Sequence, residues 1–377
     1  MQKQKIAHLT SVHPALDVRI FTKQCVSLAK AGFDVTLIAP YDKDEVRGGV
    51  KIKSIKKQNH SRIFRMIFTA LRVFIAAWRK NAKIYHFHDP ELIPFAMLLR
   101  LKGAKIIYDV HEDAPRQIMN KQWIPVFIRY PIAKILEFLE WLSCSFFFSG
   151  IVAATPQIAK RFPKKKTVIV QNFPILSEFF VADKQTDYEK RKQHAIYIGA
   201  IAKIRGIFEM VNALERVKCK EAKLQVAGVM QPKELEGQLK SLEGYKKVDY
   251  LGWQNRQQIS YILANSKLGL VVLHPKVNYM ESYPVKLFEY MAAGLPMVVS
   301  DFSFWRKIIG EYKCAIFVDP LDSEAIANAM DWIFSNPNEA KEMGQRGLKA
   351  VKEKYNWQQQ ELVLLELYEN LLHKGRG

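Results

Sequence analysis

The strongest constraint on the fold of this chain is a strand–helix–strand order at its start. Residues 5–10 have strand character, residues 20–31 have helix character and end at Gly32, and residues 33–39 form a short apolar run rich in β-branched residues. A glycine directly after a helix is a common stop signal, and such apolar runs are typical of buried parallel strands. This order predicts a doubly wound α/β sheet.

The same alternation continues for most of the chain, in two sets separated by a polar stretch at 177–193. Within the first set, Thr155 followed by Pro156 predicts the start of a helix. The remaining expected strands of the first set are 83–89, 105–113, 150–155 and 167–173, and those of the second set are 194–200, 223–228, 247–252, 267–274, 296–301 and 314–319. A chain of 377 residues is also long enough for two domains. We therefore expect two successive α/β domains joined by the polar stretch.

The net charge of +20 is concentrated in the first half. Residues 1–173 contain 29 Lys and Arg against 12 Asp and Glu, whereas residues 174–377 contain 28 against 25. Such a basic half suits an anionic partner, which could be a nucleic acid, a membrane surface or a phosphorylated substrate. The alternative is solvated charge with no partner.

Cysteine usage and hydropathy narrow the class of protein further. Four widely separated cysteines form no CxxC or Cys/His cluster, which indicates a reducing compartment and disfavours a structural zinc site. The N-terminus has no apolar signal core, and no apolar run is long enough to span a bilayer. We therefore expect a cytoplasmic protein without a transmembrane helix.

The segment 280–301 carries the sharpest chemical pattern. Glu281 and Glu289 are separated by seven residues, with Pro284 where a helix could begin. A helix N-terminus binds phosphate, and a carboxylate can accept hydrogen bonds from a vicinal diol. Lys286 in the first turn opposes the helix dipole, which a bound phosphate would justify. The alternative is an ordinary amphipathic helix with solvated Glu and Lys.

This E-x7-E pattern, followed by Tyr-Met-Ala-Ala-Gly-Leu-Pro and a strand, resembles the signature of the retaining GT-B glycosyltransferases of family 4 (glycosyl transferases group 1), in particular those of bacterial polysaccharide biosynthesis. The resemblance implies that Glu281 contacts the transferred sugar and that Glu289 holds the nucleotide ribose. It further implies that the loop and first helical turn bind the donor diphosphate through Ser282, Tyr283, Pro284, Val285 and Lys286.

A second element, residues 196–214, resembles the strand–glycine–loop–basic–glycine–helix element of the same family. Gly199 would allow a tight turn after the strand. Arg205, just before Gly206, stands where the family has a phosphate-binding Lys. The family often has Arg directly after the first Gly, where this chain has Ala200, so Lys203 is expected to supply that charge. By the same resemblance, Gly252 and Trp253 are expected near the nucleobase.

In the first half, two predicted strands end in His and carboxylate residues: His88 and Asp89 at one, and His111 at another. Ligands bind at such strand ends in open α/β sheets, although helix capping and packing are alternatives, and a metal site is not favoured. The resemblance makes His111 the first candidate and His88 the second for the contact to the transferring sugar. Otherwise His88 is expected to be acceptor-side or structural, and Asp89 is expected on the acceptor side. Asp17 and Arg19 are expected either to line the acceptor side or to pair with each other.

Two aromatic, basic segments favour membrane contact. In residues 62–80, a helix would place a polar stripe on one side and apolar side chains elsewhere; the stripe comprises Arg62, Arg65, Thr69, Arg72 and Arg79. Residues 121–142 are similar in composition. A helix of this kind suits the interface of an anionic membrane, whereas central Arg residues disfavour spanning. The alternative is a helix that covers the sheet with its Arg stripe in solvent.

The resemblance covers nearly the whole chain and implies a GT-B fold of two Rossmann-like domains facing each other across a cleft. We expect an acceptor-binding domain at 1–175, a donor-binding domain at 176–355, and a final helix at 356–377 that packs back on the first. The implied function is retaining, metal-independent hexose transfer, without a cofactor, from a nucleotide-sugar to a hydroxyl of a membrane-associated or lipid-linked saccharide in envelope or capsule synthesis. UDP is the expected nucleotide, with GDP as the alternative, at the inner face of the membrane.

Other functions remain open from the sequence. Within the same fold they are a sugar-nucleotide epimerase, a phosphorylase, or a membrane-associated partner that has lost activity. A nucleic-acid-binding protein would also be basic, but the chain has no RNP, helix-turn-helix or zinc pattern.

Overall fold

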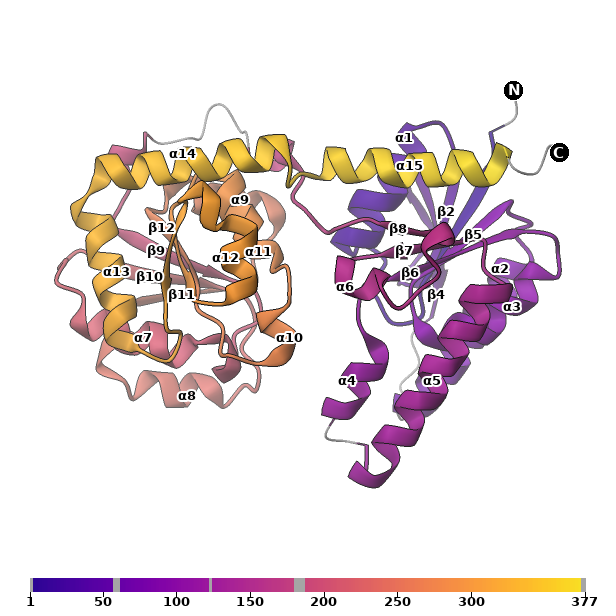
Figure 1. Cartoon of the computed structure of the whole chain (residues 1–377), viewed down its shortest axis with the longest axis horizontal. Coiled ribbons are helices and arrows are strands. Elements are labelled where there is room, and N and C mark those ends of the chain that lie inside the picture. Colours follow the sequence, from indigo (N-terminus) through magenta and orange to yellow (C-terminus); the bar gives the residue numbers. More distant parts are fainter. Residues whose placement is uncertain (1–2, 57–61, 122–123, 180–186, 374–377) are drawn as a thin grey trace. The chain divides into compact units, whose positions relative to one another are not determined.

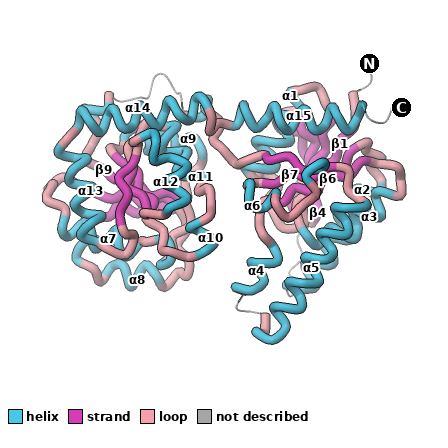
Figure 2. The backbone as a smooth tube through the Cα atoms, in the orientation of Figure 1, coloured by secondary structure: helices cyan, strands magenta, loops and turns pink. Residues whose placement is uncertain are grey.

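The computed structural model describes residues 3–56, 62–121, 124–179 and 187–373, with the backbone alone for 62–65 and Asn120. The chain divides into two units, each a sheet flanked by helices (Figures 1 and 2). Unit 1 comprises Met1–Asn172 and Gln358–Gly377, and unit 2 comprises Phe173–Trp357. The division thus falls just before the expected boundary at 175/176.

The sheet of unit 1 has eight strands in the order β3-β4-β2-β1-β5-β6-β7-β8, parallel except for the edge pair β3–β4. Strand order reverses between β1 and β5, so the loops that follow these strands lie at a switch point, where ligands bind in such folds. The strands are β1 (Lys5–Leu9), β2 (Asp34–Pro40), β3 (Glu45–Arg47), β4 (Val50–Ile55), β5 (Ile84–Phe87), β6 (Lys105–Val110), β7 (Gly150–Ala153) and β8 (Thr167–Ile169).

Helices cover both faces of this sheet. Because strand side chains alternate between faces, Tyr85 and Phe87 pack in the core beneath α2, α3 and α5, while His8 and His86 point to the face covered by α15. The helices are η1 (Val18–Cys25), α1 (Val26–Lys30), α2 (Arg62–Trp78), η2 (Pro90–Leu92), α3 (Ile93–Arg100), α4 (Ala114–Asn120), α5 (Val126–Phe146), α6 (Pro156–Ala159), η3 (Lys164–Lys166) and α15 (Trp357–His373).

Two features of unit 1 differ from the sequence expectation. The first helix begins as a π-helix, η1, and its wide turns direct the side chains of Arg19 and Gln24 inward to Asp109. The hairpin β3–β4 was not predicted. It turns at Gly48 and Gly49, whose positive φ values suit a tight hairpin connection.

The sheet of unit 2 has six parallel strands in the order β11-β10-β9-β12-β13-β14. This is the order of a dinucleotide-binding Rossmann sheet, with its switch point between β9 and β12. The strands are β9 (His194–Ile198), β10 (Lys223–Ala227), β11 (Val248–Gly252), β12 (Leu268–Val271), β13 (Met297–Ser300) and β14 (Ala315–Val318). The helices are η4 (Leu176–Glu178), η6 (Tyr188–Lys190), η7 (Lys203–Arg205), α7 (Ile207–Arg216), α8 (Leu235–Lys240), η8 (Glu243–Lys247), α9 (Arg256–Asn265), α10 (Val277–Met280), α11 (Val285–Ala292), α12 (Ser303–Ile309), η9 (Gly310–Tyr312), α13 (Ser323–Ser335) and α14 (Pro337–Glu353).

Tyr290 fixes helix α11 against the centre of this sheet. Its hydroxyl accepts a hydrogen bond from the Ile198 backbone N–H at 3.0 Å and donates to the Ile196 carbonyl at 3.3 Å. A Cβ at Gly269 of β12 would lie 2.3 Å from the Tyr290 ring, so glycine is required there for the helix to approach. The side chains of α11 are thereby held at the switch point of unit 2.

Helix α15 returns to unit 1 and closes a polar contact in its core. The Tyr368 hydroxyl lies 2.7 Å from His86 Nδ1 and 3.1 Å from His8 Nε2. Leu367 and Leu371 pack over Gly150, where a Cβ would be only 3.2 Å from Leu367. The C-terminal helix is therefore part of the unit 1 fold.

We predict that Tyr368→Phe lowers the free energy of unfolding by about 2–6 kcal/mol, because two buried imidazole nitrogens lose their partner and each such loss costs about 1–3 kcal/mol. Urea unfolding measures the change. Tyr261→Phe removes a hydroxyl from an exposed ring in unit 2 and is the matched control. Equal stability of the two variants would contradict this role of α15.

Candidate functional site

Three glycines allow backbone to pack on backbone at the switch point of unit 2. Gly199 follows β9 with φ +118°, and a Cβ at Gly228 would lie 1.8 Å from the Gly199 carbonyl oxygen. A Cβ at Gly206, which has φ +77°, would lie 1.9 Å from the carbonyl oxygen of Val272, just after β12. Glycine is required at Gly206 and Gly228 because a Cβ would overlap backbone atoms, and it is favoured at Gly199 by the positive φ, so the backbone segments pack closely at this loop.

Two cations converge on this loop. Lys286 is buried, and its Nζ lies 3.4 Å from the position of a Cβ on Gly199; Arg205 Nη1 lies 3.9 Å from the same point. Among the described residues, Lys286 Nζ has no hydrogen-bond partner, and neither cation forms an ion pair. The Tyr197 ring lies 3.7 Å below the ammonium. Burial first, and then the charge of Arg205, lower the pKa of Lys286 well below its usual value.

Glu289, one turn further along α11, is directed to a different partner. Its buried carboxylate accepts a hydrogen bond at Oε1 from Arg256 Nη1, with 2.5 Å between the two atoms. Arg256 also donates from Nε and Nη2 to Glu178 Oε2. Burial alone would lower the pKa of Arg256, but the two carboxylates outweigh it and raise that pKa.

In unit 1, the loops after β1, β5 and β6 bring together His13, Asp89 and His111. His13 Nε2 lies 2.9 Å from His111 Nε2 and 3.3 Å from Asp89 Oδ1. Asp89 is fixed through Oδ2 by the Thr10 hydroxyl and the Ser11 N–H, each at 2.7 Å. The Asp89 carboxylate can only accept a hydrogen bond, so the proton of His13 is on Nε2. His13 Nε2 therefore shares this proton between Asp89 Oδ1 and His111 Nε2. His111 then keeps its proton on Nδ1, which is buried and has no hydrogen-bond partner among the residues that the structure describes.

Sequence reasoning missed His13. Its signal was weak, because His13 stands in a loop with no neighbouring His or carboxylate closer than Asp17. Only the strand order brings it next to the residues at the ends of β5 and β6.

Arg19 and Asp17 have different partners within unit 1. The Arg19 guanidinium is buried, donates from Nη2 and Nε to the two carboxylate oxygens of Asp109, and donates from Nη1 to the Val170 carbonyl. Asp17 caps η1 by accepting from the backbone N–H groups of Arg19 and Ile20. The two side chains therefore do not pair with each other, and Arg19 belongs to the core rather than to an acceptor-facing surface.

His88 is likewise buried, and it belongs to a directional chain of hydrogen bonds. Asp109 is a carboxylate, because Arg19 and His88 outweigh the effect of burial and lower its pKa. His88 Nδ1 must therefore donate to Asp109, which leaves His88 Nε2 to accept from His8 Nδ1 at 3.1 Å. Continuing this logic, Tyr368 donates to His8 Nε2 and His86 Nδ1 donates to Tyr368. His88 is thus structural and not acceptor-facing.

A family model of known proteins matches unit 2. Residues 180–350 match the family model described as glycosyl transferases group 1. The chain carries a glycosyl transferases group 1 domain.

Similarity to individual known proteins is low in sequence and extensive in structure. A curated relative, MMP alpha-(1->4)-mannosyltransferase of Mycolicibacterium hassiacum, is 20% identical over 242 residues, which are 59% of this chain and 58% of the relative. The chain spans less than two thirds of the length of each curated relative that it matches.

Two solved structures match the whole chain in fold. Sucrose-phosphate synthase from Thermosynechococcus elongatus superposes with a TM-score of 0.78 and 17% identity, covering 99% of this chain and 100% of that one. HepE from Anabaena, solved in complex with UDP, superposes with a TM-score of 0.68 and 11% identity, covering 98% and 100%. The expected GT-B fold class is confirmed.

The other predicted residues of the group 1 domain stand in the segment that leads into α11, in η7 and at the end of β11. Pro284 is the N-cap of α11, and Glu281 is exposed in the loop before it. The Ser282 hydroxyl donates to the Tyr279 carbonyl, while the Ser282 carbonyl accepts from the Trp305 indole. Lys203 is exposed, Tyr283 and Val285 are half-buried, Gly252 has φ +65°, and the Trp253 side chain is 72% exposed.

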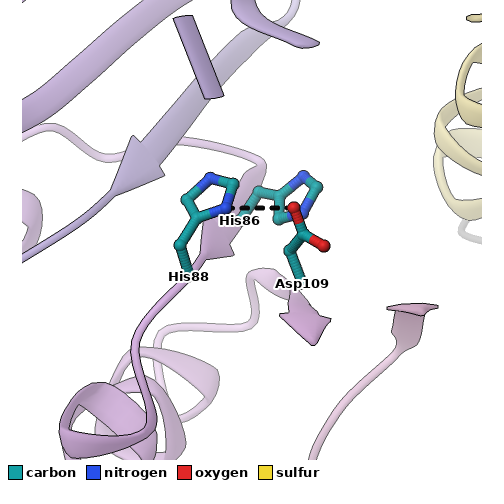
Figure 3. A group of neighbouring side chains, drawn as sticks. All are labelled: His86, His88 and Asp109. Carbon is teal, nitrogen blue, oxygen red and sulfur yellow. Dashed lines mark hydrogen bonds and ion pairs between the residues drawn. The ribbon is translucent and has the colours of Figure 1, made fainter. Parts of the chain in front are cut away.

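Figure 3 shows the group in the described part of the chain that could hold a metal ion: His86, His88 and Asp109, with ligand atoms within 4.8 Å of one another. His nitrogen and carboxylate oxygen are suitable zinc ligands. Here, however, both Asp109 oxygens already accept from Arg19, and His88 Nδ1 carries a proton. The group therefore fits a hydrogen-bond network better than a metal centre.

The same network predicts acid sensitivity of unit 1. Burial is the main cause that lowers the pKa of His8, His86 and His88, in His88 to about 3. An unfolded His has a pKa of about 6.5, so below that pH the unfolded chain binds protons that the native chain does not. The free energy of unfolding should fall as pH drops from 6.5 toward 4, by about 4 kcal/mol per pH unit if all three contribute. Urea unfolding at pH 7.5, 6 and 5 measures this slope.

The control for this prediction is His373→Gln, which removes an exposed histidine at the end of α15. It should leave the slope unchanged. A wild-type stability that is the same at pH 7.5 and pH 5 would contradict the neutral, buried histidine network.

Proposed function

We propose that this protein is a retaining, metal-independent glycosyltransferase. It would move a hexose from a UDP-sugar to a hydroxyl of a lipid-linked or membrane-associated saccharide, in the synthesis of an envelope or capsular polysaccharide. The group 1 domain would bind the donor, and unit 1 would bind the acceptor.

The observation that carries the proposal is the unpartnered Lys286 ammonium. A buried charge without a counter-ion is costly, yet this cation lies with Arg205 beside the Gly199 loop, and the described residues offer it no hydrogen-bond partner. A diphosphate would supply the missing anion to both cations. Backbone N–H groups at the start of α11, next to Pro284, would add further donors.

The remaining donor contacts follow from this placement. Glu289 would accept hydrogen bonds from the ribose hydroxyls, and Glu281 would orient the hexose. The exposed indole of Trp253, beside Gly252 at the end of β11, is available to stack on the base. His111, with a partnerless Nδ1, would donate to a hydroxyl of the transferring sugar.

In the reaction, the bond between the anomeric carbon and the diphosphate oxygen breaks, and a bond from the same carbon to the acceptor oxygen forms on the same face. The acceptor proton passes to an oxygen of the departing diphosphate. Lys286, Arg205 and Lys203 would stabilise the charge that develops on the leaving group, which is the role a metal ion has in other transferases.

Calorimetric titration of UDP, GDP, ADP and TDP and their hexose conjugates tests the donor site, with Glu289→Ala as the site variant. We expect UDP to bind tightly and more weakly to the variant. Absence of any binding below millimolar concentration would contradict the proposal. Donor turnover without a glycosylated acceptor would favour the epimerase alternative.

We predict that Lys286→Met abolishes UDP binding and yet stabilises the empty protein by about 1 kcal/mol. The variant loses a buried unpaired cation, whose cost is about 1–3 kcal/mol, and a cation–π contact worth roughly 0.5–1 kcal/mol. Thermal unfolding and calorimetry together measure both effects. Lys349→Met, at an exposed lysine of the same unit, is the control. A less stable Lys286→Met protein, or one that still binds UDP, would contradict the assignment.

Membrane contact of unit 1 is supported by an exposed apolar face on three neighbouring helices, α2, α3 and α5, of which α3 contacts the other two. On α5, Phe127 is 81% exposed, and helical spacing places Phe138 and Trp141 on the same stripe. Figure 1 shows α4 and the first half of α5 projecting from the body of unit 1. Lys134 and Lys102 lie over exposed aromatic rings, as basic residues do at a membrane interface.

The polar stripe expected on residues 62–80 is not present as predicted on α2. Thr69 is buried with Ala70 and Val73, while the outer side carries Phe68 and Ile75 together with the exposed Arg72 and Arg79. The outer side is thus more apolar than expected. The side chains of Arg62 and Arg65 lie outside the described residues. Within the described part of the chain, no helix is long and apolar enough to cross a membrane.

We predict that the double variant Phe127→Ser/Phe138→Ser binds anionic vesicles at least tenfold more weakly than wild type, because each exposed Phe contributes about 1.5–3 kcal/mol when buried. Sedimentation with vesicles of phosphatidylglycerol and phosphatidylcholine measures the binding. The control, Tyr261→Ser/Trp332→Ser, removes exposed rings from unit 2. Equal binding of both variants, or equal binding to pure phosphatidylcholine, would contradict this interface.

A further inference from the structure

We propose that Arg256 is a positioning residue that assigns Glu289 to the ribose and thereby leaves Lys286 free for the diphosphate. The inference rests on the donor site proposed above and names what makes that site selective. It concerns the described residues of unit 2 alone.

Lys286 and Glu289 stand three residues apart on α11, a spacing at which opposite charges on a helix usually pair. Both are buried, and in a buried environment this attraction is strong. Glu289 does act electrostatically on Lys286, because it raises the pKa that burial and Arg205 lower. Nevertheless, the ammonium has no hydrogen-bond partner. Something must hold the carboxylate away from it.

Arg256 is placed to do this. Its Nη1 donates to Glu289 Oε1, and among the described ion pairs this is the one that Glu289 forms. A guanidinium satisfies a buried carboxylate better than an ammonium can, because it remains charged and presents donors in a fixed plane. With Oε1 held by Arg256, Oε2 is left to accept from a ribose hydroxyl.

Arg256 is itself fixed from the opposite side, so it cannot follow Glu289 toward Lys286. Its Nε and Nη2 both donate to Glu178, whose backbone carbonyl accepts from the Ser260 hydroxyl at 2.7 Å. A capping box between Asn255 and Gln258 fixes the first turn of α9, where Arg256 stands. The guanidinium thus bridges η4 and α11.

This arrangement explains why one helix can carry two opposite charges with two different ligands. Without Arg256, Glu289 would turn to Lys286, and the ion pair would consume both the ribose acceptor and the phosphate donor. Removing the guanidinium should therefore impair two separate contacts at once. If Arg256 had only a structural role, neutralising Glu289 in the Arg256 variant would not restore the diphosphate contact.

The experiment uses calorimetry on the full chain with three probes: UDP, 2′,3′-dideoxy-UDP and inorganic pyrophosphate. Wild type should prefer UDP over the dideoxy analogue by about tenfold or more, since the hydroxyls bind a charged acceptor. Arg256→Gln should lose this preference and bind pyrophosphate about tenfold more weakly. Arg256→Gln/Glu289→Gln should regain wild-type pyrophosphate affinity without regaining the ribose preference.

Arg346→Gln is the control, because it removes a guanidinium that pairs with Glu339 and Glu342 on α14, away from Arg256. It should change none of the three affinities, and all variants should show the circular dichroism spectrum of wild type. Three results would overturn the inference: Arg256→Gln retains the ribose preference, Arg256→Gln binds UDP more tightly, or the double variant fails to regain pyrophosphate binding. Failure of wild type to bind UDP, GDP and pyrophosphate would instead overturn the donor site itself, and this inference with it.

Discussion

The buried ammonium of Lys286 is the feature on which the rest of unit 2 depends. It is costly for the empty protein, because burial and Arg205 both disfavour its charge. Its position is nevertheless fixed by its surroundings: the Tyr197 ring lies against it, Gly199 lies next to it, and Tyr290 anchors its helix to β9. A site that holds strain of this kind before its ligand arrives is pre-organised for an anion.

Both units place polar residues at the same topological position, where strand order reverses, but the charges gathered there differ. In unit 2 the switch point collects cations beside a glycine loop. In unit 1 it collects histidines and carboxylates, with His13 and His111 at the loops and His88 and Asp109 behind them.

Much of the fold could be predicted from the sequence, because buried parallel strands are short apolar runs that are visible without an alignment. The hairpin β3–β4 was missed because its strands are short and partly exposed, although Gly48 and Gly49 did signal a turn. In the site, the motif located Lys286 and Glu289, but no local pattern indicated Arg256, which comes from another helix. Likewise, the sequence could not show that Arg19 pairs with Asp109, since ninety residues separate them and only the sheet brings them together.

Proton uptake on nucleotide binding tests the central claim most directly. If a diphosphate is the counter-ion that Lys286 lacks, its binding must raise a pKa that is lowered in the empty protein. Titration of UDP at a series of pH values from 7 to 10, each in two buffers that differ in ionisation enthalpy, should show proton uptake over the pH range in which Lys286 titrates in the empty protein, and this uptake should disappear in Lys286→Met. Binding of UDP without proton uptake, or uptake that persists in the variant, would contradict the account.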